Sequence, residues 1–204
     1  RVAGNSLINY DTIKDKIKIS GYGKYLRKLI KENQLDENVV FLGRLSAVEM
    51  KKEYLSCGVF VSCSANENSP NSLAEAMMLG VPCVASNVGG TPSVFTGGED
   101  GILYESGREY EDTINNICNP KRIEQNNQNI DTIRTTEITN KSNNYHRLQQ
   151  NVTNLMQAVV TIWENPEETA AFCENARKHA RKTHDREANY KRMVEIYAEI
   201  AGAE

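Results

Sequence analysis

The sequence lacks any apolar run long enough to cross a membrane. Its 204 residues hold no stretch of 18 apolar side chains, and a spanning helix needs about 20. Near the start, where a signal peptide would need an apolar core, residues are charged instead: Asp11, Lys14, Asp15, Lys16 and Lys18. We therefore expect neither a membrane span nor a signal peptide.

A basic excess is also missing. Lys and Arg number 24 against 27 Asp and Glu, which gives a net charge of −3. A general nucleic-acid binder carries a basic patch or stripe, so we expect no nucleic-acid partner. The 25% of charged and 39% of hydrophobic residues are ordinary for a folded globular chain.

Metal-ligand spacing is absent as well. The five cysteines form no Cys-x-x-Cys pair, and the three histidines have no ligand spacing to a cysteine. An odd cysteine count without a signal peptide predicts reduced thiols in a cytoplasmic protein. No Gly-x-Gly-x-x-Gly opens a helix after a strand, so a dinucleotide-binding Rossmann enzyme is not expected. We predict no metal and no cofactor.

Strand and helix patterns alternate over the first half of the chain. Short apolar runs of strand length occur at residues 1–5, 39–42, 59–61, 81–85 and 101–104, with 16–19 as a further possible strand. Helical patterns lie between them, at residues 24–33, 46–56 and 69–79. Ser46 and Glu49 form a predicted capping box at the start of the second, and Gly80 is predicted to end the third. Alternation of this kind predicts a parallel sheet flanked by helices. We therefore expect an α/β, Rossmann-like domain over residues 1–108.

The second half divides into two regions. Residues 109–147 are rich in Asn, which competes with the helix backbone for hydrogen bonds, and we expect a partly disordered or weakly helical insertion. Residues 148–204 are predicted to be helices that pack back on the same domain, the last of them capped by Asp185. Their expected inward residues are Leu155, Val159, Ile162, Trp163, Phe172, Ala176, Ala180, Tyr190, Met193, Val194 and Tyr197.

One segment has the residue types of a ligand site. Ser69 is predicted to cap a helix with Pro70 as its first residue. The amides near Asn71 and Ser72 would then face an anion such as a pyrophosphate. Glu67 precedes that helix, and Glu75 lies about 9 Å along its axis. Carboxylates can accept two hydrogen bonds from a vicinal diol, as in a sugar. The spacing alone is equally met by Glu67 as an ordinary loop residue and Glu75 as an ordinary surface residue of the helix.

This segment resembles the signature of glycosyltransferase family 4, the group 1 glycosyltransferases of GT-B fold. Their pattern is Glu-x7-Glu-Ala, then Gly-x-Pro, an apolar strand and a Gly-Gly turn. Here it reads Glu67 to Glu75-Ala76, Gly80-Val81-Pro82, 84–86, Gly89-Gly90 and 101–104. Upstream, residues 21–23, 36–44 and 54–61 resemble further segments of the family, so the resemblance covers residues 1–105.

The resemblance implies a role for each matching position. Glu67 would contact hydroxyls of the donor sugar and is the one residue we assign as catalytic. Glu75 would bind the ribose, and the backbone from Pro70 to Ser72 the diphosphate. The predicted substrate-binding set is Glu67, Asn68, Ser69, Pro70, Asn71, Ser72, Glu75, Gly43, Arg44, Gly21 and Tyr22.

The sequence also departs from the family pattern. Asn68-Ser69-Pro70 replaces the usual Gly and aromatic residue, Gly58 replaces Asp, and the Asn-rich insertion is not part of the pattern. The family's diphosphate-binding Arg and Lys have no counterpart in residues 1–20. Because the chain opens at Arg1, we expect a piece of a longer protein, with an N-terminal GT-B domain as partner.

The expected activity is that of a retaining, hexosyltransferase-type glycosyltransferase. The resemblance implies a nucleotide-diphosphate sugar donor and a saccharide or lipid-linked acceptor, with a cytoplasmic location or one at the inner membrane face. GT-B epimerases and sugar-chain synthases share this architecture. The alternative of another class is a non-catalytic nucleotide- or protein-binding module on the same fold.

Overall fold

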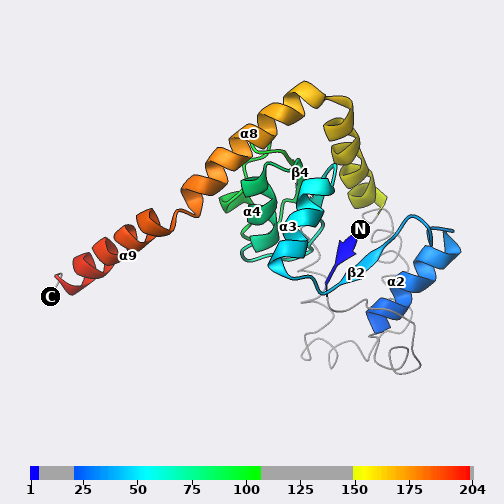
Figure 1. Cartoon of the computed structure of the whole chain (residues 1–204), viewed down its shortest axis with the longest axis horizontal. Coiled ribbons are helices and arrows are strands. Elements are labelled where there is room, and N and C mark those ends of the chain that lie inside the picture. Colours follow the sequence, from blue (N-terminus) through cyan, green and yellow to red (C-terminus); the bar gives the residue numbers. More distant parts are fainter. Residues whose placement is uncertain (5–20, 107–148, 203–204) are drawn as a thin grey trace, which may run out of the picture. The chain divides into compact units, whose positions relative to one another are not determined.

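The computed structural model describes residues 1–4, 21–106 and 149–202 (Figure 1). Two compact units are present, Arg1–Ser56 and Cys57–Glu204. The predicted strand at 16–19 and the Asn-rich insertion at 109–147 lie outside the described residues. The domain boundaries at 108 and 148 remain predictions. Among the described helices, none has the length and apolar character needed to span a membrane.

The first unit contains a parallel two-stranded sheet and two helices. Strand β1 (Val2–Ala3) pairs with β2 (Phe41–Gly43), and helices α2 (Gly21–Glu32) and α3 (Ala47–Ser56) complete the unit. The guanidinium of Arg27 on α2 lies 5.5 Å from the centre of the Phe41 ring. A cation over an aromatic face is attracted by the ring's negative potential, so this pair joins α2 to β2.

The predicted capping box at the start of α3 is confirmed. The Ser46 amide donates to the Glu49 carboxylate at 2.8 Å, and the Glu49 amide lies 3.4 Å from the Ser46 hydroxyl. The Ser46 hydroxyl also donates to Glu49, and these bonds lower the pKa of the Glu49 carboxyl. Two amides without helical partners are thereby satisfied, which fixes where α3 begins.

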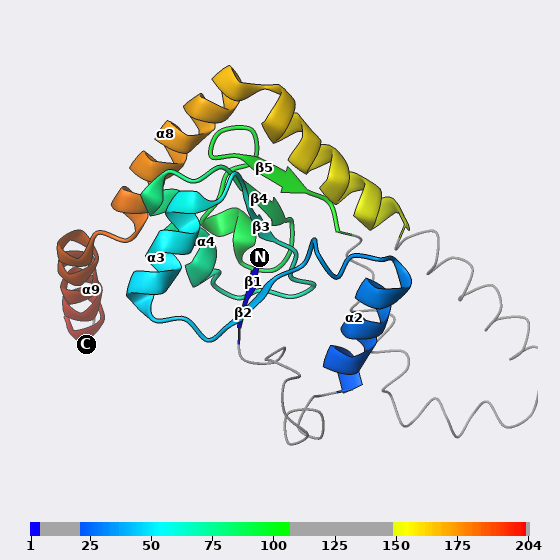
Figure 2. The same cartoon turned by 45° about the vertical axis from the view of Figure 1, so that its right-hand side comes forward.

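The second unit is built on a three-stranded parallel sheet in the order β3–β4–β5 (Figure 2). Its strands are β3 (Phe60–Ser62), β4 (Cys83–Ser86) and β5 (Ile102–Tyr104). All four residues of the central strand β4 are buried. A strand buried on both faces is typical of a parallel sheet covered by helices, as the sequence predicts.

Three helices pack on this sheet. Helix α4 (Asn71–Leu79) contacts β3, β4 and helix α8 (Pro166–Thr183). A further helix over residues 149–164 joins α8 in a core cluster with the sheet. The cluster's buried members are Val84, Tyr104, Ala158, Ile162 and Phe172. The predicted burial of Ile162, Phe172, Ala176 and Ala180 is confirmed.

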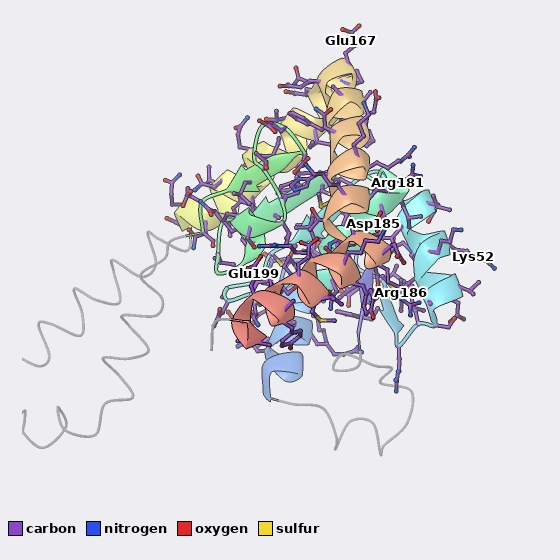
Figure 3. All side chains as sticks on the ribbon, turned by 90° about the vertical axis from the view of Figure 1, so that its left-hand side faces the viewer. Lys52, Glu167, Arg181, Asp185, Arg186 and Glu199 are labelled. Carbon is purple, nitrogen blue, oxygen red and sulfur yellow. The ribbon has the colours of Figure 1, made fainter. Side chains whose placement is uncertain are left out.

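The last helix departs from the prediction. Helix α9 (Arg186–Ala201) is preceded by Asp185 (Figure 3). The Asp185 carboxylate accepts from the Ala188 amide at 2.8 Å, so the predicted cap is confirmed. However, α9 buries none of its residues, and the apolar residues predicted to face inward are exposed: Tyr190, Met193, Val194 and Tyr197. Trp163 is likewise 79% exposed. A helical apolar pattern identifies one face of a helix but supplies no partner to cover it.

Alkaline pH should destabilise the second unit through the Cys83 thiol. Burial raises the pKa of this thiol above its ordinary value of 9.0. Above pH 9 the folded chain therefore keeps the thiol proton while the unfolded chain loses it. The free energy of unfolding has its full value below pH 9 and decreases as the pH rises above 9. The loss is at most about 1.4 kcal/mol per pH unit for one proton. Burial also raises the pKa values of Cys173 and Tyr104, which add to the same trend.

The measurement is urea unfolding followed by circular dichroism from pH 7 to 10.5 under reducing conditions. Cys83→Ala should flatten the alkaline slope of the unfolding free energy. Cys63→Ala, at an exposed cysteine, is the matched control and should retain the wild-type slope. Equal slopes for wild type and Cys83→Ala would contradict the prediction.

Candidate functional site

The candidate site lies at the carboxyl ends of β3 and β4. Parallel strands bind ligands at this edge of a sheet. The segment from Cys63 to Pro70 follows β3, and the turn over residues 87–90 follows β4. Both segments carry residues that the sequence analysis singled out. The structure brings them into direct contact.

Glu67 is held by its backbone and by its side chain. Its carbonyl accepts a 2.8 Å hydrogen bond from the Gly90 amide. Its Oε2 accepts from the Ser64 hydroxyl at 3.3 Å, and the residue is half-buried. Ser64 is itself fixed, because the hydroxyl of Ser86 donates to its carbonyl at 2.7 Å. No role is predicted for Ser64 or Ser86 from the sequence.

The Gly89-Gly90 turn packs against the backbone of the Glu67 loop. A Cβ on Gly89 would overlap the carbonyl oxygen of Glu67, and one on Gly90 would overlap that of Asn68. Gly89 also has φ of +48°, a left-handed conformation that other residues adopt at a cost. Glycine is therefore required at both positions for the loop to sit where it does. The adjacent glycines in the sequence were the signal of this close approach.

The predicted cap of α4 is wrong. The helix begins at Asn71 with Pro70 in the capping position, and no side chain caps it. The Asn71 amide donates to the Ser69 carbonyl at 2.9 Å, and the Leu73 amide donates to Pro70 at 3.0 Å. Pro70 itself has no N–H. The helix end still carries the positive end of its dipole, but few of its amides are available to an anion.

Asn68, Ser69, Asn71 and Ser72 are exposed around this helix end, whereas Pro70 is buried. Glu75 is exposed on α4, among residues that are buried on either side of it in the sequence. The predicted end of α4 at Gly80 is confirmed: Gly80 has φ of 70°, and its N–H donates to the carbonyls of Ala76 and Met77. Glu67 and Glu75 thus lie on two successive elements of one unit.

The other predicted site residues belong to the first unit. Gly43 ends β2 with φ of 69°, and the exposed Arg44 follows it. Gly21 and Tyr22 form the first turn of α2. Their place in a common site with Glu67 and Glu75 remains a prediction.

A second polar cluster anchors α8 to the loop before β5. The Asp100 carboxylate is 3% exposed and accepts from the Thr96 amide at 2.8 Å. His179 Nδ1 lies 2.6 Å from the same oxygen. The Asn175 amide group donates to the Glu99 carbonyl, and the Arg177 guanidinium to the carbonyl of Leu79 at the end of α4. Sequence reasoning missed this cluster, which has a structural role in fixing α8.

The described residues hold no group of three or more His, Cys, Asp or Glu arranged to bind a metal ion. The candidate site consists of a restrained carboxylate, Glu67, a second carboxylate, Glu75, on the following helix, and the positive end of that helix between them in the sequence. Such a set can accept hydrogen bonds from hydroxyl groups and can attract an anion.

Comparisons with known proteins show which family the chain belongs to. The profile of the family Glycosyl transferases group 1 matches residues 8–134. The chain therefore belongs to the group 1 glycosyltransferases, as its motifs predict.

Solved structures share the fold. Sucrose-phosphate synthase (tll1590) from Thermosynechococcus elongatus superposes with a TM-score of 0.63 at 19% identity, over 99% of this chain and 38% of that chain. Anabaena Alr3699/HepE in complex with UDP and glucose gives a TM-score of 0.59 at 19% identity, over 97% of this chain and 39% of that one. The expected fold class, a parallel α/β sheet flanked by helices of GT-B type, is confirmed.

One relative is similar in sequence. N-acetyl-alpha-D-glucosaminyl L-malate synthase from Bacillus anthracis is 36% identical over 81 residues, which make up 39% of this chain and 20% of that protein. The chain thus spans about two fifths or less of the proteins it matches.

Proposed function

We propose that this chain is the donor-binding part of a retaining glycosyltransferase that takes a nucleotide-diphosphate sugar. The observation that carries the proposal is the restrained Glu67 loop at the sheet edge, followed by Glu75 on the helix after it. Membership of the group 1 family supports it. Anabaena HepE, which shares the fold, forms complexes with UDP and with UDP-glucose.

The proposed roles follow from the chemistry of the groups. The Glu67 carboxylate accepts hydrogen bonds from hydroxyls of the glycosyl group, and Glu75 accepts them from the ribose. The positive end of α4 stabilises the diphosphate as it leaves with negative charge. Gly43, Arg44, Gly21 and Tyr22 would border the base. An N-terminal domain would bind the acceptor, which is a saccharide or a lipid-linked acceptor.

Removing either carboxylate should weaken donor binding by about 1–3 kcal/mol, because a hydrogen bond to a charged group is lost. Glu67→Ala should weaken binding of UDP-glucose or GDP-mannose and leave UDP or GDP nearly unchanged. Glu75→Ala should weaken all ligands of the selected base equally, because the ribose is common to them. Isothermal titration calorimetry with these four ligands is the measurement.

Glu164→Ala, at an exposed glutamate of the same unit, is the control and should bind as wild type. Saturable binding that both site variants leave unchanged would contradict the proposed site. A folded wild-type chain that binds none of the four ligands would favour the non-catalytic module instead.

A further inference from the structure

We propose that Ser64 is a positioning residue that orients the Glu67 carboxylate toward a bound glycosyl group, and that Ser86 holds the segment carrying both residues. The inference rests on the proposed function and deepens it, because it names what sets the orientation of the sugar-binding carboxylate. Two hydrogen bonds support the inference. The Ser86 hydroxyl on β4 donates to the Ser64 carbonyl, and the Ser64 hydroxyl donates to the Glu67 carboxylate.

The series starts from a fixed point. Ser86 is the last residue of β4 and is 1% exposed, so its side chain cannot move without opening the sheet. Its hydroxyl donates to the Ser64 carbonyl across 22 residues of sequence. The position of the loop after β3 is therefore set by the end of the neighbouring strand. Strand ends are more rigid supports for a site than loops are.

Tyr104 adds a neighbour to Ser86. Burial raises the pKa of the Tyr104 hydroxyl, and a hydrogen bond with Ser86 partly offsets that rise. The Tyr104 hydroxyl therefore lies near the Ser86 hydroxyl. The Ser86 hydroxyl directs its own hydrogen to the Ser64 carbonyl.

The last step reaches the carboxylate. The Ser64 hydroxyl lies 3.3 Å from Glu67 Oε2, while the Gly90 amide holds the Glu67 carbonyl at 2.8 Å. Among the described residues, Ser64 is the side chain that engages this carboxylate, and only through one oxygen. The other oxygen is left for a ligand. A carboxylate restrained in this way loses less conformational entropy on binding than a free one.

The test compares serine variants of the full chain by calorimetry with UDP-glucose against UDP, and with GDP-mannose against GDP. Ser64→Ala should weaken binding of the sugar nucleotide about tenfold and that of the nucleotide less than about twofold. Ser64→Thr keeps the hydroxyl and should restore binding, and Ser86→Ala should resemble Ser64→Ala. Ser56→Ala is the matched control, since this hydroxyl donates to the Glu53 carbonyl at 3.0 Å within α3.

The outcomes separate this inference from the proposed function. If wild type binds and Glu67→Ala loses the sugar contribution but Ser64→Ala does not, the inference is wrong and the proposed function stands. If wild type binds neither sugar nucleotide, the proposed function fails. The positioning of the Glu67 loop by Ser64 and Ser86 is then tested by amide hydrogen exchange of Gly90. The inference then requires faster exchange in Ser64→Ala and Ser86→Ala than in wild type, and unchanged exchange overturns it.

Discussion

Gly90→Ala should destabilise the second unit by about 3 kcal/mol and abolish nucleotide-sugar binding. The added Cβ would overlap the carbonyl oxygen of Asn68, a backbone atom that cannot rotate away as a side chain would. Forcing extra volume into a packed site costs about 1–3 kcal/mol, and backbone contacts lie at the upper end of that range. Gly90 precedes a short 3-10 helix (Thr91–Ser93) and has φ of −81°, which alanine adopts freely. The whole effect therefore comes from the close approach of the two loops.

Urea unfolding and calorimetry measure the two parts of this prediction. Gly98→Ala is the control, since Gly98 has φ of +81° but nothing within 4 Å of an added Cβ. It should cost about 1–2 kcal/mol through its backbone conformation and leave binding intact. A Gly90→Ala protein that binds as wild type would show that the contact between the loops is not needed.

Phe95→Ala should cost about 3–5 kcal/mol of unfolding free energy, the range for truncating a buried aromatic side chain. Phe95 is fully buried, and its ring lies 2.8 Å from where a Cβ on Gly101 would stand. The backbone cannot shift to fill the cavity that Phe95→Ala leaves. The Phe95 amide donates to the Thr91 carbonyl, and the Thr96 amide donates to the Asp100 carboxylate. The measurement is urea unfolding followed by circular dichroism.

Trp163→Ala tests whether this loss reflects burial or merely the size of the ring. Trp163 is the larger side chain but is 79% exposed, so its truncation should cost less than about 1 kcal/mol. Similar losses for the two variants would mean that Phe95 is not the core residue described above.

Local sequence signals predicted the features that depend on neighbours within a few residues. The Ser46 box, the Asp185 cap and the Gly80 end of α4 each involve groups at most four residues apart, and each is confirmed. The alternation of strands and helices gave the fold class for the same reason.

Other features depend on partners that the sequence does not reveal. The Ser69 cap is wrong because the backbone at Pro70 takes φ of −76° and ψ of 79°, which gives Pro70 the capping position. The Asp100–His179 pair joins residues 79 apart, and Ser86 reaches Ser64 across 22. No local pattern marks such pairs. The catalytic role of Glu67 and the binding roles of the other site residues remain predictions.

The start of α4 has a consequence for the forces that would hold a phosphate there. With Pro70 lacking an N–H and the amides of Asn71 and Leu73 already donating within the chain, attraction comes from the helix field more than from aligned donors. Where solvent reaches it, such a field is screened within about 8 Å at physiological ionic strength. Affinity for a phosphate at this helix end would therefore fall as the ionic strength rises.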